Sequence, residues 1–445
     1  MYCLQTTRRI ARRTRRSVCF SIFLAGLLLL PASWVSAAEA PLTLAEAQRR
    51  ALAHSRQLLA KDFAITASYE AAVAASQLPD PIIKIGIDNL PVSGADRFSL
   101  TNDFMTMRRV GVMQEITRVD KRQLRSAALS QTAEKTSAEK EVAAAAIERD
   151  TAIAWLDLYY AKAMSAVIAE QGAQAKLEIQ AADGAYRGGR GSQAEVFAAR
   201  SAVASFEDRQ SEYQRRILNA RTMLARWTGD NGDIALAGKP DTNVIRLDPA
   251  TLETQLAHHP EIAVSSRQVD LAETEAKLAR ANKKPDWSVE LAFQQRGPAY
   301  SNMVSVGVSI PFQWDQRNRQ DRQLASKLAG IDQAKSEREE MLRDHVMQTR
   351  LQINEWNNNR ERARRYERDL VPLAAQRTLA GITAYSGGKA TLAEVLAARR
   401  NEIDVRLQAL QLQADTARLW AQLNFLFPTS TAAAHAGMDF LEDVK

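Results

Sequence analysis

Residues 185–200 read AYRGGRGSQAEVFAAR, and residues 384–399 read AYSGGKATLAEVLAAR. Ten of the sixteen positions are identical, at an offset of 199 residues, and each copy lies between two long segments of helical pattern. We call the turns at 185–192 and 384–391 the first tip and the second tip. Two such stretches on one chain predict two helical hairpins and an internal duplication.

Each tip combines a helix stop with a helix start. The glycine pairs are expected to end the incoming helices, because glycine takes the left-handed C-terminal conformation at little cost. These pairs are Gly188-Gly189 and Gly387-Gly388. The outgoing helices are expected to begin with capping boxes, in which a hydroxyl accepts from the N3 amide and a Glu accepts from the cap amide. The capping residues are Ser192 and Glu195 in the first tip, and Thr391 and Glu394 in the second.

The first 38 residues have the pattern of a secretory signal peptide. Six arginines between Arg8 and Arg16 precede an apolar run from Val18 to Leu30, and small residues follow at 36–38. The apolar run is too short to span a membrane as a helix. The chain is therefore expected to be exported. It is expected to carry no lipid anchor, because no cysteine lies at the cleavage point.

Charge and cysteine content exclude several classes of function. The formal net charge of +7 falls to near +1 without the signal peptide, so nothing favours a nucleic-acid partner. Both cysteines, Cys3 and Cys19, lie in the signal peptide. No disulfide, thiolate metal site or cysteine nucleophile is then possible in the rest of the chain.

Each half of the chain is predicted to contain a helix, a β-hairpin, a long helix, a tip and a helix. The first repeat (39–228) is expected to have a helix over 42–78, strands over about 81–90 and 107–116, a long helix over 119–184, and a helix over 192–228. A linker over 229–250 follows. The second repeat (251–427) is expected to have a helix over 251–283, strands over about 287–296 and 302–313, a long helix over 318–384, and a helix over 391–426, before a tail over 428–445.

The predicted strands have the length of membrane strands. Apolar residues alternate with polar ones over about ten residues, which matches a tilted strand in a bilayer. After the signal peptide we find no apolar run long enough for a membrane helix, and four strands are too few to close a barrel. An oligomer is therefore expected. The residues expected to face lipid are Ile83, Ile85, Ile87, Val304, Val306 and Val308.

The two tips resemble those of the outer membrane factor (TolC) family. The matching residues are Tyr186, Gly188-Gly189, Ala194-Glu195-Val196, Tyr385, Gly388 and Glu394-Val395-Leu396. The resemblance implies a mainly helical fold: a homotrimer with a twelve-stranded β-barrel in the outer membrane of a Gram-negative bacterium, and a helical barrel in the periplasm. The linker and the tail would lie in an equatorial belt around the helical barrel. The family forms the exit ducts of tripartite pumps and does no chemistry.

The first hairpin resembles the heavy-metal efflux branch of this family, whose members are similar to CusC (copper, silver) or CzcC (cobalt, zinc, cadmium). The residues that carry this resemblance are Leu78-Pro79-Asp80-Pro81, Asp88-Asn89-Leu90-Pro91, Asp103-Phe104-Met105-Thr106 and Lys121-Arg122. The function implied is the outer-membrane channel of a resistance-nodulation-division efflux system for heavy-metal cations.

The resemblance also implies roles for residues of the tips. A periplasmic adaptor and an inner-membrane resistance-nodulation-division pump would dock there, on Tyr186, Arg187, Gly188, Gly189, Arg190, Gly387, Gly388 and Lys389. Tyr385 and Glu394 match the periplasmic gate. The second acidic position of the family gate is Ala397 in this chain, and the capping box by itself also explains Glu394.

Metal, cofactor and catalytic sites are not predicted. Of the five histidines, His258 and His259 are adjacent and precede Pro260, so they are expected to begin a helix and not to line one face of it. Met105, Met107 and Met113 offer soft ligands, but apolar filling of a strand is the favoured interpretation. No nucleophile–base arrangement or nucleotide loop supports an enzyme.

Two other functions fit the pattern. The first is an outer-membrane duct for organic drugs or for type I secretion of a polypeptide, which would share the architecture. The second belongs to a different class: a periplasmic coiled-coil scaffold or adaptor without a pore. Fractionation distinguishes the second, because a scaffold would not be recovered as an outer-membrane trimer.

Overall fold

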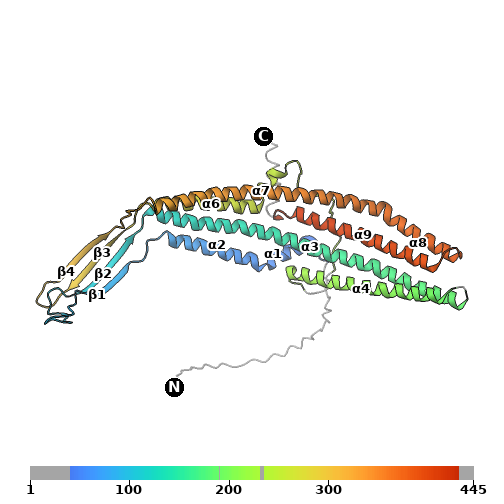
Figure 1. Cartoon of the computed structure of the whole chain (residues 1–445), viewed down its shortest axis with the longest axis horizontal. Helices are drawn as coiled ribbons and strands as arrows, with labels where there is room; N and C mark the ends of the chain where they lie inside the picture. The colour runs from blue at the N-terminus through green and yellow to red at the C-terminus, as the bar shows by residue number, and fades with distance from the viewer. Residues whose placement is uncertain (1–40, 190, 231–234, 430–445) are drawn as a thin grey trace, which may run out of the picture. The chain divides into compact units, whose positions relative to one another are not determined.

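The computed structural model describes residues 41–189, 191–230 and 235–429 (Figure 1). The expected signal peptide, Arg190, part of the linker and most of the tail lie outside the described residues. The first half contains α1 (Leu44–His54), α2 (Arg56–Ala75), β1 (Ile82–Asp88), β2 (Met107–Ile116), α3 (Val119–Arg187) and α4 (Gln193–Thr228). The second half contains α5 (Leu252–Leu256), α6 (Pro260–Ala281), β3 (Trp287–Gln295), β4 (Met303–Ser309), α7 (Gln320–Arg365), the π-helical turn η1 (Tyr366–Leu370), α8 (Val371–Ser386) and α9 (Leu392–Asn424).

Three predicted helices are interrupted, each at a residue with a physical reason to break it. The helix predicted over 42–78 is divided at Ser55, whose hydroxyl accepts from the amide of Leu58 and caps α2. The helix predicted over 251–283 is divided before Pro260, which lacks an amide hydrogen and begins α6. The helix predicted over 318–384 contains η1 just before Pro372, and a π turn is one way to accommodate a proline within a helix.

The four strands form one antiparallel sheet in the order β1-β2-β3-β4. The register continues across the sheet: Ile85 pairs with Val110, Val110 with Phe293, and Phe293 with Val304. The two hairpins of the duplicated halves therefore pair with each other through β2 and β3. Among the described residues, β1 and β4 each have one neighbour, so the sheet has two open edges in this part of the chain.

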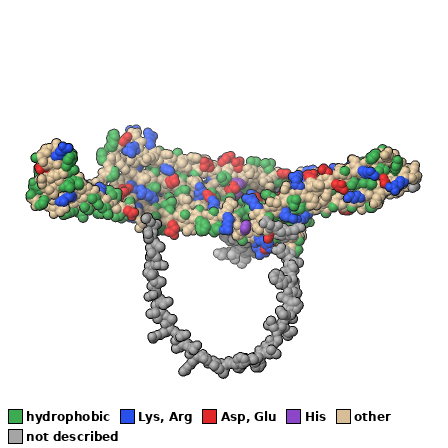
Figure 2. Space-filling view, turned by 90° about the horizontal axis from the view of Figure 1, so that it is seen from below, with side chains coloured by type: hydrophobic (Ala, Val, Ile, Leu, Met, Phe, Trp, Pro, Cys, Tyr) green, Lys and Arg blue, Asp and Glu red, His purple; other side chains and the backbone are tan. Residues whose placement is uncertain are grey.

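One face of this sheet is apolar and exposed. The paired row contains Ile85 and Val304, and the next row contains Ile83, Val112, Leu291 and Val306. Exposure in these two rows reaches 80% at Ile85 and 73% at Val306. Figure 2 shows hydrophobic side chains over the strand end, whereas charges of both signs are spread along the helices.

The opposite face of the sheet is polar. The carboxylate of Glu290 on β3 binds Lys84 on β1 at 2.8 Å and also Arg109 on β2. On the same face, Gly111 on β2 pairs with Ala292 on β3. A Cβ atom at position 111 would lie only 3.0 Å from the Ala292 side chain. The sheet thus has the two chemically different faces expected of a strand set that separates lipid from water.

The long helix α3 is central, because it contacts α1, α2, α4, α6 and α9. Among the described residues, α3 is the one helix that contains a segment long and apolar enough to cross a membrane. The sequence had predicted no such segment after the signal peptide. In that segment 56% of the residues are buried inside the protein. Its alanines and other apolar residues pack against neighbouring helices. A helix buried in this way can be as apolar as a helix that spans a membrane.

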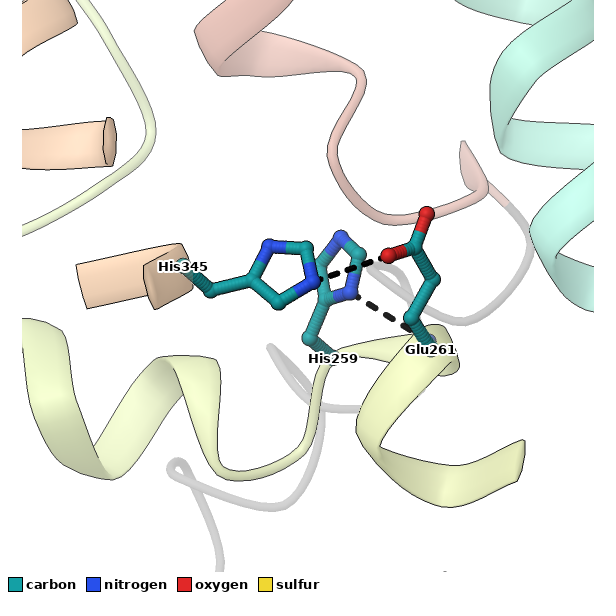
Figure 3. Close-up of side chains that lie close together, drawn as sticks. All are labelled: His259, Glu261 and His345. Atoms are coloured by element: carbon teal, nitrogen blue, oxygen red, sulfur yellow. Dashed lines mark hydrogen bonds and ion pairs between the residues drawn. The ribbon is translucent and has the colours of Figure 1, made fainter. Parts of the chain in front are cut away.

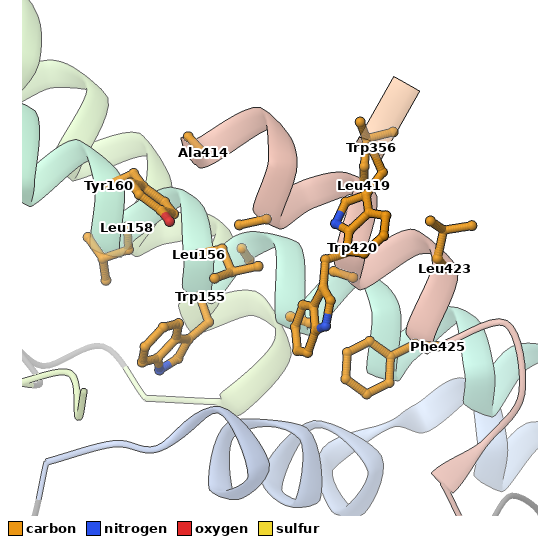
Figure 4. Close-up of a cluster of buried hydrophobic side chains, with 14 of the residues drawn as sticks. Trp155, Leu156, Leu158, Tyr160, Trp356, Ala414, Leu419, Trp420, Leu423 and Phe425 are labelled. Atoms are coloured by element: carbon orange, nitrogen blue, oxygen red, sulfur yellow. The ribbon is translucent and has the colours of Figure 1, made fainter. Parts of the chain in front are cut away.

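The main hydrophobic core holds the linker against the helices (Figure 4). Three tryptophans donate their indole N–H to backbone oxygens: Trp155 to Leu42 at 3.0 Å, Trp356 to Thr242 at 3.3 Å, and Trp420 to Val244 at 2.8 Å. A buried indole N–H needs such a partner. The described part of the irregular linker is thereby fixed to α7 and α9 by side chains that also fill the core.

Candidate functional site

The two tips lie together at the end of the helices opposite the sheet (Figure 1). The glycine pairs end α3 and α8 as predicted, and only the second glycine of each pair is left-handed. Gly188 and Gly387 have φ of −83° and −84°, whereas Gly189 and Gly388 have φ of +71°. One left-handed residue is enough to turn the chain out of the helix.

The second tip ends its helix with a complete Schellman motif. The amide of Lys389 donates to the carbonyl of Ala384 at 2.8 Å, and that of Gly388 donates to Tyr385 at 3.0 Å. These bonds satisfy two carbonyls that the end of α8 would otherwise leave unpaired. In the first tip the corresponding bond from Gly189 to Tyr186 is also 3.0 Å.

Both capping boxes are present. In the first tip, the Ser192 hydroxyl accepts from the Glu195 amide at 3.3 Å, and the Glu195 carboxylate accepts from the Ser192 amide at 2.9 Å. In the second tip, Thr391 and Glu394 make the same pair of bonds at 3.3 and 2.8 Å. The duplicated sequence therefore builds the same capping box twice, and α4 and α9 start in the same way.

The surface of the tips is accessible. Arg187, Gly188, Gly189, Gly387, Gly388 and Lys389 are exposed, and the Arg190 of the docking prediction lies outside the described residues. The two tyrosines differ: Tyr186 is 47% exposed, whereas Tyr385 is half-buried against a hydrophobic cluster. Glu394 is exposed, with one carboxylate oxygen engaged in the capping box.

A single hydrophobic cluster, which we call the tip core, lies behind both tips. Its members come from α3, α4 and α9: Ala175, Ala182, Val196, Ala199, Ala202, Val203, Phe206, Leu392, Leu396 and Ile403. Both copies of the duplicated stretch contribute, through Val196 in the first and Leu396 in the second. The two tips are thus attached to one core.

A buried polar network next to the tip core was not predicted. The guanidinium of Arg399, only 7% exposed, binds Glu178 at 2.6 Å and Gln171 at 2.9 Å, which ties α9 to α3. The duplication contained a signal for it, since Arg200 is the matching residue of the first copy. Arg200 is exposed, however, so the repeat alone does not tell which arginine is buried.

A second cluster of polar side chains lies in the middle of the helices, where α5, α6 and α7 meet (Figure 3). The Nε2 atom of His345 on α7 lies 2.8 Å from a carboxylate oxygen of Glu261 on α6. His259 caps α6, because its Nδ1 accepts from the Glu261 amide at 3.3 Å. We call these three residues the His-Glu cluster; sequence reasoning did not find it, because His345 is distant in the chain.

Burial decides the charge state within the His-Glu cluster. His259 is 6% exposed, and burial, together with the neighbouring His345, lowers its pKa to about 4. The hydrogen bond from His345 lowers the pKa of the Glu261 carboxyl, against a smaller opposite effect of burial. At neutral pH the cluster therefore presents an uncharged imidazole and a carboxylate.

The chain is similar in fold to solved structures of outer-membrane proteins. The chain matches the outer-membrane channel OprN with a TM-score of 0.72 at 15% identity, over 86% of this chain and 90% of that one. It matches CusC with a TM-score of 0.72 at 15% identity, over 86% and 92%. It matches the outer membrane protein VceC from Vibrio cholerae with a TM-score of 0.69 at 18% identity, over 86% and 95%.

In sequence, the chain is similar to the cobalt-zinc-cadmium resistance protein CzcC of Cupriavidus metallidurans. The two are 28% identical over 257 residues, which is 57% of this chain and 59% of that protein. The match thus spans less than two thirds of the curated relative. No protein-family model matches the chain. The resemblance to the outer membrane factor family and its heavy-metal branch is confirmed by the shared fold and by this relative.

Proposed function

We propose that this chain is the outer-membrane exit duct of a tripartite resistance-nodulation-division efflux system that exports heavy-metal cations. The observation that carries the proposal is the similarity to CzcC, a protein named for cobalt, zinc and cadmium resistance, in a chain with the fold of outer-membrane channels. The duct is passive, since an inner-membrane pump supplies the energy.

The proposed duct is a homotrimer. The sheet has an exposed apolar face and two open edges, and an unpaired strand edge in hydrocarbon leaves amides and carbonyls unsatisfied. Pairing β1 of one copy with β4 of the next removes both edges. Three copies of a four-stranded sheet give a twelve-stranded barrel, within the size range of outer-membrane barrels.

The tips are the proposed docking surface for the periplasmic adaptor. Their glycines, Arg187 and Lys389 are exposed, and the tip core behind them holds the two turns together. An adaptor could therefore recognise backbone and basic side chains on a supported surface. Arg190, although outside the described residues, belongs to the same proposed set.

Tyr385 and Glu394 are the proposed periplasmic gate. Glu394 is exposed, and one such carboxylate per subunit would form a ring that attracts cations and narrows the entrance. Tyr385 packs against the tip core, so a movement of α9 relative to α8 would displace it. Unchanged conductance and cation selectivity of single channels with Glu394→Ala would rule out the gate role of this carboxylate.

Growth of a deletion strain tests the substrate. The strain is grown across copper, silver, zinc, cobalt and cadmium, with dyes and detergents in parallel, and is complemented with the wild-type gene. Sensitivity restricted to one or two metals supports the proposal and names the cation. Sensitivity to dyes and detergents with unchanged metal tolerance would contradict the metal assignment and favour a drug duct.

A further inference from the structure

We propose that the His-Glu cluster (His259, Glu261 and His345) binds one divalent transition-metal ion of intermediate softness, such as Zn²⁺ or Co²⁺. The cluster lies at the start of α6, which in Figure 1 is in the middle of the helices, away from both the tips and the sheet. The proposal concerns a site on the protein itself and does not depend on what the channel exports.

The distances within the cluster are close to those of a metal site. One ligand atom from each residue can be chosen so that all three lie within 4.8 Å of one another. In a tetrahedral zinc site, bonds of about 2.1 Å place the ligand atoms roughly 3.4 Å apart. Forming a coordination shell would open the His345–Glu261 pair slightly from 2.8 Å and close the widest separation by roughly 1.4 Å. In Figure 3 the two rings and the carboxylate lie together and come from α6, its N-terminal cap and α7.

The ligand atoms are also held in place before any ion binds. His259 is buried. The centroid of its ring lies 4.6 Å from that of His345 and 5.6 Å from that of Phe427. The side chain of His345 is 18% exposed and already bound to Glu261. Glu261 is half-exposed, with 46% of its side chain accessible, so an ion can enter from its side.

Binding replaces the bond between His345 Nε2 and the Glu261 carboxylate, with the Nε2 proton passing to Nδ1 or to solvent, and also one hydrogen bond of His259. The Nδ1 atom of His259 accepts from the Glu261 amide at 3.3 Å, and its ring also has a backbone hydrogen bond with Leu426. The first of these is longer than the usual limit of about 3.2 Å for such bonds, so it is the bond we expect to be exchanged. The exchange turns a weak cap of α6 into a link between α6 and α7.

The ligand types select the ion. Two imidazoles and one carboxylate suit zinc, cobalt and nickel, whereas magnesium and calcium prefer oxygen ligands, and silver or cuprous copper prefer sulfur. Three protein ligands leave at least one coordination position for water, as in sites that exchange ligands. We therefore expect a reversible site that braces α6 against α7 when the cation is abundant.

The experiment uses the full-length mature protein without an affinity tag, purified in detergent and stripped with a chelator. Co²⁺ is titrated in, its visible absorption gives the stoichiometry and affinity, and Zn²⁺ and Mg²⁺ are added as competitors. Wild type is expected to bind one Co²⁺ per chain, displaced by Zn²⁺ and not by Mg²⁺. Glu261→Gln and His345→Gln should each weaken binding at least tenfold, since loss of a mere outer-shell partner already costs about 10–100-fold.

The matched control is His258→Gln. His258 is exposed, adjacent to His259 and outside the cluster, so its replacement should leave the affinity unchanged. The conservative variant His259→Asn keeps a residue that caps helices well and should also weaken binding, which separates ligand loss from misfolding. Absence of Co²⁺ binding by wild type, or equal affinity in wild type, Glu261→Gln and His345→Gln, would overturn the proposal.

The outcome is distinguishable from that of the export proposal. Binding is measured on the purified chain, whereas export is measured as metal tolerance of cells. One possible result is that the purified chain binds Co²⁺ through the His-Glu cluster, while deletion of its gene leaves the metal tolerance of the cells unchanged. This result would uphold the site and overturn the export function. The reverse pair of results would overturn only the site.

Discussion

At the residue scale, the two glycines of the second tip have different backbone conformations. Gly388 has φ of +71°, whereas Gly387 has φ of −84°. At neither position would a Cβ meet a neighbour closer than 3.5 Å, so space does not explain either glycine. Only the left-handed angle of Gly388 requires glycine, because side chains with a Cβ are strained there.

Gly388→Ala is therefore expected to destabilise the helical end by about 1–2 kcal/mol per chain, and Gly387→Ala by much less. The measurement is the thermal midpoint of the purified protein, followed by circular dichroism in one detergent. Gly387→Ala is the matched control, because it adds the same methyl group one residue earlier. Equal midpoints for the two variants would contradict the backbone argument.

The His259 side chain predicts a loss of stability in mild acid. Its pKa is about 4 in the folded chain and near 6.5 when unfolded, so the unfolded chain binds more protons between these values. Stability is then fully present above about pH 6.5 and falls as the pH decreases toward 4. The groups facing the ring are His345 on α7 and Glu261 on α6, and Arg149 on α3 acts on Glu261.

Between about pH 7 and pH 5, wild type should lose roughly 2 kcal/mol more stability than His259→Asn. The pKa of Glu261 is lowered, so its contribution to stability is present above its ordinary value of 4.5 and is lost mainly below it, outside this window. Denaturant titrations at the two pH values, without divalent metal, measure the difference. The same pH dependence in both proteins would show that His259 does not titrate as its burial implies.

At the scale of elements, the linker depends on the helices that it crosses. Trp356 on α7 and Trp420 on α9 each donate an indole N–H to a linker carbonyl. The described part of the linker, residues 229–230 and 235–250, has little regular structure of its own to satisfy its backbone. Its position is therefore set by side chains of α7 and α9, which also belong to the core shown in Figure 4.

Trp420→Phe should loosen the linker while the helices stay folded. The change removes the 2.8 Å bond to Val244 and part of the ring, a loss of about 1–2 kcal/mol. Faster cleavage within 235–250 by a protease, detected by mass spectrometry, is the expected result. The control is Trp314→Phe, at a residue that is 81% exposed. Cleavage at the same rate in both variants would show that the bond does not hold the linker.

The tips and strands follow from local chemistry, which is why the sequence predicts them. A glycine pair, a hydroxyl with a Glu three residues later, and alternation of apolar residues each act within a few neighbouring positions. The interruption near Pro372 was missed because the helical periodicity continues through it. Contacts such as Arg399 with Glu178 and His345 with Glu261 join distant helices, so no local pattern encodes them.

At the scale of the whole molecule, the two faces of the sheet differ in polarity, and the proposed duct places the apolar face against lipid. Val306 and Ser305 are adjacent on β4 and belong to opposite faces: Val306 pairs in the apolar row with Leu291, and Ser305 pairs with Ala292. Val306 is 73% exposed although it is apolar. An exposed apolar row on one face and bound charges on the other fit a barrel wall.

Val306→Arg should impair assembly in the outer membrane, whereas Ser305→Arg should be tolerated. A basic side chain on the lipid face costs about 2–4 kcal/mol near the middle of the bilayer and less near its surfaces. The measurement is the amount of trimer in outer-membrane fractions, resolved on gels without heating. Equal amounts for the two variants would contradict the assignment of the faces.

The open edges of the sheet also bear on how such a protein is made. A single copy in hydrocarbon would leave the outer backbone groups of β1 and β4 without partners, so the proposed homotrimer would have to associate before it inserts. Its assembly would then depend on the concentration of newly exported chains. In a cell that makes both intact chains and chains with a mutated β1 or β4 edge, a mutated chain would join intact chains in trimers that cannot close the barrel. A mutation confined to one edge would consequently act as a dominant trait.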